Sequence, residues 1–250
     1  CLTNGEFSKI KIDRTFTGEV DRLTARPKEA EASYRTALTL LDGLGDDARL
    51  DRARARSNLG LVLKDENRLA DARAALTAAA AEARAAGDAA DARWQVARAL
   101  LNLGSVLRLA NEPGPADAAY REAEALLDGL AAEHPDKPRF RRELAKVLVN
   151  RGNLLARGDA ATAAASLVRA RDLLARLAAD VPKNPEFRLD LANACNGLAS
   201  VAFARQNPAD AERWLSAAAD AGRGLLATHP DVPAYHAGLG MDLGNLGRVR

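Results

Sequence analysis

The sequence is poor in the residues that usually build catalytic and metal sites. It has two cysteines, Cys1 and Cys195, and three histidines, His134, His229 and His236. Two cysteines are too few for a disulfide framework, and no His, Cys or carboxylate cluster has the spacing of a metal site. No nucleophile elbow and no phosphate loop of the GxxxxGK[ST] form occurs. We therefore expect no metal, no cofactor and no enzymatic activity in this segment.

Charge and hydropathy exclude two further classes of protein. The 36 basic and 34 acidic residues leave a net charge of +2, too balanced to indicate nucleic-acid binding. No apolar run approaches the ~18–20 residues that a membrane span requires, and the first apolar patch is too short for a signal peptide. We expect a cytoplasmic protein. The chain opens with Cys rather than Met and ends inside a helical pattern, which predicts a piece of a longer protein.

What the sequence does contain is a repeat. A small residue recurs in the middle of a helical pattern, at intervals of 42, 44, 48, 47 and 48 residues: Gly18, Gly60, Gly104, Gly152, Ala199 and Gly247. Three more series begin at Ala30, Tyr34 and Ala37 and share intervals of 42, 44, 47 and 48. Self-similarity at this period indicates a solenoid.

Each repeat has the pattern of two helices. In residues 53–85, apolar residues recur with helical spacing on both sides of a polar turn, and no segment from residue 28 onward alternates like a strand. We predict an all-α fold in which the recurring Gly lets the two helices of a pair approach closely. Arg56 is unexpected because it falls on an apolar stripe. The turns are predicted near Asn67, Glu112, Gly158 and Asn207.

The repeats divide most of the chain. Their approximate bounds are 26–50, 51–90, 91–137, 138–184, 185–232 and a partial repeat at 233–250. Residues 1–25 stay unassigned, since a short strand and a degenerate first helix fit equally well. Residues 238–244 superficially resemble a dinucleotide-binding loop, but they follow no strand and lie in repeat register, so we predict a helix there.

The repeated residues resemble the tetratricopeptide repeat (TPR) family. The shared pattern is Leu-Gly in the first helix, followed by Ala, a large apolar residue and Ala in the second. It is carried by Leu59, Gly60, Ala72, Leu76 and Ala79, and again by Leu103, Gly104, Ala116, Tyr120 and Ala123. The period exceeds the family's usual length of about 34, as in long-period variants. The resemblance implies an α-solenoid of stacked antiparallel helix pairs that forms a right-handed superhelix.

A second resemblance concerns the connectors. The string Pro-x-x-Pro-x-Phe-Arg-x-x-Leu-Ala occurs at 135–145 and again at 182–192. It resembles repeats that follow the kinase domain in some large bacterial Ser/Thr protein kinases. This implies an alternative function, in which the segment is a regulatory or substrate-recruiting tail and an absent kinase domain is its partner in cis.

One polar constellation is a candidate binding site. In three first helices a cation lies four residues before an Asn, so each pair shares a face that is not the apolar stripe. The resemblance implies that first helices line a concave groove. Asn can donate to and accept from a peptide backbone, and Arg or Lys can bind a carboxylate. The candidate residues are Arg54, Asn58, Arg98, Asn102, Lys146, Asn150, Asn153 and Asn193.

Two interpretations of these residues remain open. In the first, the chain is an interaction module or scaffold that binds an extended, acidic or C-terminal peptide, or a partner helix, in the groove. In the second, the Asn side chains bond neighbouring repeats to each other across their interface, and the two interpretations can hold together.

Overall fold

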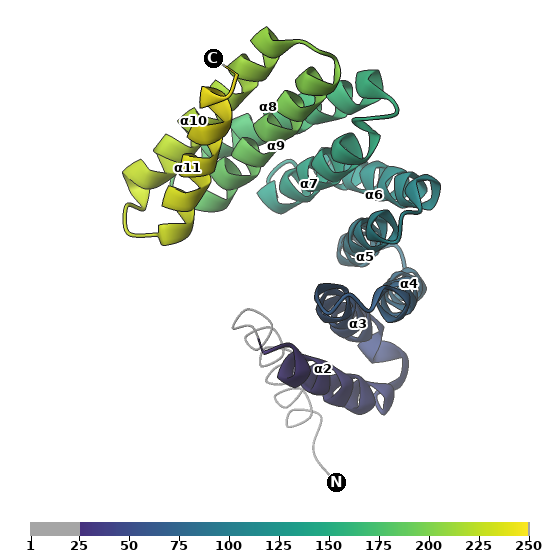
Figure 1. Ribbon diagram of the computed structural model, residues 1–250. Helices are drawn as coiled ribbons and strands as arrows, with labels where there is room; N and C mark the ends of the chain where they lie inside the picture. Colours follow the sequence, from purple (N-terminus) through teal and green to yellow (C-terminus); the bar gives the residue numbers. More distant parts are fainter. Residues whose placement is uncertain (1–25, 250) are drawn as a thin grey trace. The chain divides into compact units, whose positions relative to one another are not determined.

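The computed structural model describes residues 26–249, and its regular structure is helical throughout that range. Ten α-helices and one 3-10 helix, η1, follow one another, and no strand occurs among the described residues (Figure 1). The prediction for residues 1–25 lies outside this range. The helices are α2 (Pro27–Asp42), η1 (Gly45–Ala48), α3 (Arg49–Asp65), α4 (Leu69–Ala85), α5 (Ala90–Leu109), α6 (Pro113–Glu133), α7 (Pro138–Leu155), α8 (Ala160–Asp180), α9 (Pro185–Ala204), α10 (Pro208–Thr228) and α11 (Pro233–Gly247).

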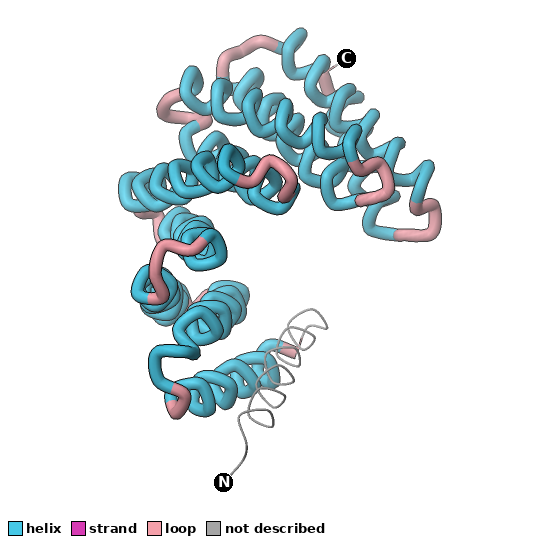
Figure 2. The backbone as a smooth tube through the Cα atoms, turned by 180° about the vertical axis from the view of Figure 1, so that it is seen from behind, coloured by secondary structure: helices cyan, strands magenta, loops and turns pink. Residues whose placement is uncertain are grey.

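Short turns join the two helices of each pair (Figure 2). Three of these turns contain a residue with positive φ: Asn67 at 60°, Asn111 at 60° and Gln206 at 55°. This left-handed conformation reverses the chain within a few residues, and Asn tolerates it better than most side chains. The turns fall where the sequence predicted them. The chain divides into two compact units, residues 1–126 and 127–250, and each is described by itself.

Helix starts follow from the sequence. Six of the described helices, α2, α6, α7, α9, α10 and α11, begin with Pro, whose fixed φ suits the first helical turn. Asp159, Asn184 and Asn207 cap α8, α9 and α10, because each side-chain oxygen accepts a hydrogen bond of 3.0–3.1 Å from a backbone N–H of the first turn. These caps fix where each of these three helices of the second unit begins.

The recurring Gly packs against the recurring large apolar residue, as predicted. A Cβ on Gly60 would lie 2.6 Å from Cγ of Leu76, and a Cβ on Gly152 would lie 2.5 Å from Cγ of Leu167. At Gly104 the same atom would overlap the Tyr120 ring. These partners are fully buried. The series of small residues that contains Gly60 and the series of large apolar residues that contains Leu76 therefore form the two sides of one helix–helix contact.

The Arg residues of α3 pair with a carboxylate on α4. Arg52, only 8% exposed, donates from Nε to both oxygens of Glu82 at 3.2 Å, and its Nη1 donates to the carbonyls of Leu41 and Gly45 at 3.2 and 2.6 Å. Arg56 also donates to Glu82. This contact explains the cation on the apolar stripe, because the guanidinium of Arg56 leaves the stripe to reach Glu82.

The Glu82 cluster should make stability depend on pH. Burial alone would raise the pKa of the Glu82 carboxyl, but hydrogen bonds and ion pairs with Arg52 and Arg56 outweigh burial and lower the pKa. A lowered folded-state pKa gives stability that is present above the unfolded value of about 4.3 and is lost as pH falls through the folded value. We expect Glu82→Gln to lose less stability than the parent between about pH 5 and pH 3. Urea unfolding at each pH measures this, and parallel curves for the two proteins would contradict it.

Candidate functional site

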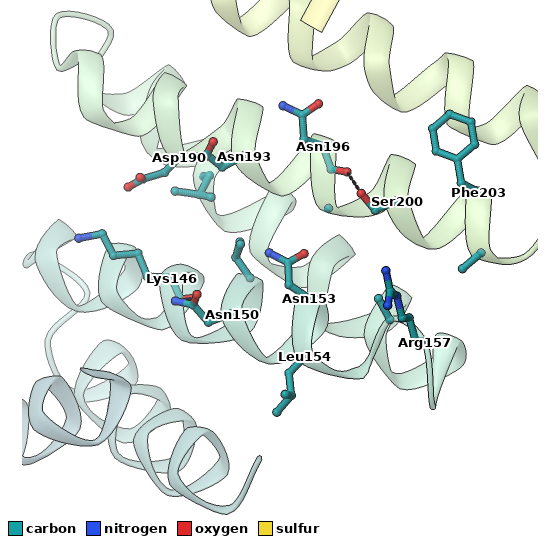
Figure 3. A pocket seen from close by; sticks show the side chains of 15 residues that line it. Lys146, Asn150, Asn153, Leu154, Arg157, Asp190, Asn193, Asn196, Ser200 and Phe203 are labelled. Carbon is teal, nitrogen blue, oxygen red and sulfur yellow. Dashed lines mark hydrogen bonds between the residues drawn. The ribbon is translucent and has the colours of Figure 1, made fainter. Parts of the chain in front are cut away.

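A groove lies between α7 and α9 in the second unit. Its volume is about 1040 Å³, and side chains from both helices line it (Figure 3). Lys146 and Asp190 lie at one end, and Arg157 and Phe203 lie at the other. Between the ends the lining is mostly amide and hydroxyl groups, with some apolar side chains. The polar lining residues between the ends are Asn150, Asn153, Asn193, Asn196 and Ser200.

The hydrophobic pattern of each helix decides which residues line the groove. In α7 the apolar face, including Phe140, Leu144 and Leu148, is buried. Lys146, Asn150 and Asn153 follow one another at spacings of four and three, so they share a different face of the helix. On α9, Asn193, Asn196 and Ser200 have the same spacings in reverse order. Two polar helix faces thus border the groove.

The asparagine side chains of this groove differ in the hydrogen bonds that they make to the protein. Asn150 Nδ2 donates to the carbonyl of Lys146 at 3.0 Å, and Asn196 Nδ2 donates to Asp242 Oδ1 on α11 at 2.8 Å. In residues 26–249, the side chains of Asn153 and Asn193 make no hydrogen bond to protein. Both residues are exposed, so their amide donors and acceptors are available to a ligand.

A glycine brings the two helices together at the middle of the groove. A Cβ on Gly197 of α9 would lie 2.8 Å from Asn153 Oδ1 and 2.7 Å from Cδ2 of Leu167. Such distances are too short for non-bonded atoms, so a larger residue here would displace Asn153 or Leu167. Gly197 therefore leaves room for the Asn153 amide.

The charges at the two ends are not equivalent. Lys146 Nζ donates to Glu143 Oε1 at 3.1 Å, and Asp190 Oδ2 accepts from Arg142 Nε at 2.7 Å. These pairs largely neutralise one end. Arg157 is exposed, and the part of the chain that the structure describes provides no carboxylate within ion-pair distance of it. The end near Arg157 thus has an unneutralised positive charge.

The groove contains four of the eight residues that the sequence singled out: Lys146, Asn150, Asn153 and Asn193. The other four lie in the first unit, on α3 and α5. There Arg54 Nη1 is 3.7 Å from Asp51 Oδ1, and the guanidinium of Arg98 lies 5.2 Å from the centroid of the Trp94 ring. That Arg54, Asn58, Arg98 and Asn102 belong to the same binding surface stays a prediction.

The competing interpretation can be compared with the geometry. It expects Asn58, Asn102 and Asn150 to bond the backbone of an adjacent helix. Asn150 instead bonds to its own helix, and Asn58 and Asn102 bond to none of the described residues. The side chains at these three positions therefore do not bond an adjacent helix among the described residues.

The lining residues that sequence reasoning missed include Asn196, Arg157 and Phe203. Two of them had a signal, since Asn196 lies three residues after Asn193 and Arg157 lies four after Asn153, the spacings that place residues on one helix face. Phe203 had none, because an aromatic residue in a helical pattern is usually buried. Here it is 49% exposed.

The glycine-rich stretch near the end of the chain is helical. Residues 238–244 lie inside α11, as a helix rather than a phosphate loop. In residues 26–249, no group of three or more His, Cys, Asp or Glu is placed to hold a metal ion. None of the helices in that range is both long enough and apolar enough to cross a membrane.

The comparison with solved structures supports the fold. No protein-family model matches the chain, and no curated protein matches its sequence. Among solved structures, BtubC (BKLC) from P. vanneervenii is 19% identical with a TM-score of 0.66, over 86% of this chain and 79% of that one. A Rap protein complexed with Competence and Sporulation Factor is 16% identical with a TM-score of 0.60, over 99% and 67%. TTC0263, a TPR protein of Thermus thermophilus, is 16% identical with a TM-score of 0.52, over 93% and 98%.

Proposed function

We propose that this chain, which has a TPR-like α-solenoid fold, is a protein-interaction module and that its α7–α9 groove binds an extended peptide. The observation that carries the proposal is the pair of amides at Asn153 and Asn193. They face a groove of about 1040 Å³ and make no hydrogen bond to the described protein. The similar Rap protein, which is complexed with Competence and Sporulation Factor, is consistent with partner binding on this fold.

The amides suit a peptide backbone. An Asn side chain can accept from a backbone N–H and donate to a backbone carbonyl at once, so it recognises an extended chain independently of its side chains. Each such bond contributes about 0.5–1.5 kcal/mol net, because water is displaced from both partners. Apolar lining residues such as Val149 and Leu154 add contact area between the polar groups.

The charges favour an acidic ligand. Lys146 and Asp190 each have a partner of opposite charge in the protein, whereas Arg157 has none among the described residues. A carboxylate of the ligand, from a side chain or from the C-terminus, can accept two hydrogen bonds from one guanidinium. We therefore place an acidic group of the ligand beside Arg157.

The test is a comparison of variants on a selected peptide. A displayed library of random decapeptides is selected on the full chain, and the best peptide is measured by calorimetry. We expect the double variant Asn153→Ala/Asn193→Ala to bind it roughly tenfold more weakly, since two hydrogen bonds of about 0.7 kcal/mol each are lost. The double variant Arg73→Ala/Arg121→Ala is the control, because these exposed side chains lie on the second helices α4 and α6.

Equal affinities for the two double variants, with unchanged thermal unfolding, would contradict a role for the amides. The further variant Asn58→Ala/Asn102→Ala shows whether first-unit residues belong to the same surface. A loss of affinity in this variant would extend the site to α3 and α5, and no loss would confine it to the α7–α9 groove.

The proposal is compatible with the kinase-tail hypothesis, which the resemblance of the connectors suggests. A tail of this kind would itself act by binding a peptide or a protein. Reading the genomic open reading frame on both sides of this segment tests the hypothesis. A Gly-rich loop with HRD and DFG motifs upstream would support it, and their absence would remove it.

A further inference from the structure

A second cavity continues the groove toward α11. It has a volume of about 290 Å³, and it shares Asn196, Ser200 and Phe203 with the α7–α9 groove. Its other lining residues are Ala199, Leu215, Asn245 and Arg248. The two cavities therefore meet along one edge of α9, and a chain lying in the first can pass over Phe203 into the second.

Phe203 stands at the junction of the two cavities. Its side chain is 49% exposed, which is unusual for an aromatic side chain of this size. In the preceding repeats the residue four positions after the recurring small residue is Lys64, Arg108 or Ala156, so this aromatic belongs to the α9 repeat specifically. An exposed ring that lines two adjoining cavities offers a contact for an apolar side chain.

Each of the two cavities that Phe203 lines is also lined by one arginine. Arg157 follows α7 and lines the first cavity, and Arg248 follows α11 and lines the second, beside Asn245. Both are exposed, and neither forms an ion pair with the described residues. A cation at the end of a helix also stabilises that helix through its dipole, so the position alone does not indicate a ligand. Here, however, the two arginines also line cavities that share Asn196, Ser200 and Phe203.

The spacing of the helices bounds the length of the ligand. Helix α7 contacts α9, and the 2.8 Å hydrogen bond from Asn196 to Asp242 joins α9 to α11. If each step has the ordinary helix spacing of about 8–10 Å, the two steps from α7 to α11 cover roughly 16–20 Å. An extended chain advances about 3.3 Å per residue, so about five or six residues cover that distance.

We propose, resting on the function proposed above, that the ligand is a linear acidic–apolar–acidic segment. Its apolar side chain contacts Phe203, one carboxylate binds Arg157, and a second carboxylate about five residues away binds Arg248 and Asn245. The Asn153 amide binds the backbone next to the first carboxylate, and the Asn193 amide binds the backbone farther along the groove, toward Asp190 (Figure 3).

Three fluorescein-labelled nonapeptides of Gly and Ser test this, measured by fluorescence anisotropy on the full chain. One has Glu at positions 2 and 7 with Leu between them, and in each of the other two one Glu is replaced by Gln. We expect the doubly acidic peptide to bind roughly fivefold more tightly than either single-Glu peptide. In the Arg248→Gln variant, replacing one of the two Glu residues of the peptide by Gln should no longer weaken binding. Replacing the other Glu should still weaken it. Arg205→Gln is the matched control, since Arg205 is an exposed cation just after α9 that lines a different cavity.

The outcomes separate the two proposals. If Arg248→Gln keeps the full preference while Asn153→Ala/Asn193→Ala loses affinity, the second subsite is refuted and the peptide groove stands. If Leu→Ser in the doubly acidic peptide leaves its affinity unchanged, the role of Phe203 is refuted. If none of the peptides binds at about 1 mM, the acidic–apolar–acidic segment is refuted. Whether the groove binds a peptide at all is then tested separately, with the library-selected peptide.

Discussion

We expect Glu82→Ala to lower the free energy of unfolding by about 3 kcal/mol, because a buried cation loses its hydrogen-bonded counter-ion and keeps only the exposed Asp42, whose Oδ1 is 4.0 Å from Arg52 Nε. The side chain of Arg52 is 9% exposed, and both of its hydrogen bonds to a charged group go to Glu82. The carbonyls of Leu41 and Gly45 would still accept from its Nη1, which keeps the loss from being larger. Removing one partner of a buried pair costs more than the pair itself contributes, since the other charge stays desolvated.

Urea unfolding at pH 7 measures this loss. Glu82→Gln should be intermediate, because an amide oxygen still accepts from Arg52 but carries no charge. The control is Glu122→Ala, which breaks an ion pair with Arg84 whose side chains are 48% and 50% exposed. Exposed pairs of this kind contribute about 0–1 kcal/mol. If Glu82→Ala and Glu122→Ala had similar effects, Arg52 would not be held in a desolvated site.

The second large effect is expected at the recurring glycine. Gly104→Ala places a methyl group inside the Tyr120 ring, which is fully buried and whose hydroxyl lies 3.3 Å from Ser105 Oγ. Overpacking of this kind costs about 1–3 kcal/mol, against the ~1 kcal/mol that Ala gains over Gly in a helix. Because the Tyr120 ring is fully buried, we expect a net loss of up to about 2 kcal/mol, and chemical denaturation measures it.

Gly240→Ala supplies the matched comparison. Gly240 lies in the interior of α11, and a Cβ there meets nothing within 4 Å. With no close neighbour, the substitution should stabilise the protein by about 0.5–1 kcal/mol. The same change of residue should therefore have opposite signs at the two sites. Stabilisation at both would show that Gly104 is not required for packing.

The helix pairs and their contacts could be predicted from the sequence because a solenoid repeats the same helix–helix contact from one unit to the next. Gly60 lies 16 residues before Leu76 and Gly104 lies 16 residues before Tyr120, and in both of these repeats the two residues meet. The turns could be placed for the same reason. Contacts that occur in one repeat alone have no such signal. Arg56 stood out as a charge on an apolar stripe, but its partner Glu82 is 26 residues away, and no spacing rule connects them.

The candidate site was predictable to the extent that it depends on one helix. Lys146, Asn150 and Asn153 share a face of α7, and the spacing shows this. Which of these amides is free depends on neighbours in three dimensions. The Asn150 side chain donates to the backbone carbonyl of Lys146. The Asn153 side chain, which lies beside Gly197, makes no hydrogen bond to the described residues. The exposure of Phe203 depends on α7, α9 and α11 together, so no single helix indicates it.

The most direct test of the peptide groove is a titration of the ¹⁵N-labelled chain with the library-selected peptide, following the side-chain amide resonances of asparagine. We expect the Asn153 and Asn193 resonances to shift and to saturate with the calorimetric dissociation constant. The resonances of Asn67 and Asn111, which lie in turns between first and second helices, should stay in place. Shifts confined to residues outside α7 and α9, with Asn153 and Asn193 unchanged at saturation, would contradict peptide binding in the α7–α9 groove.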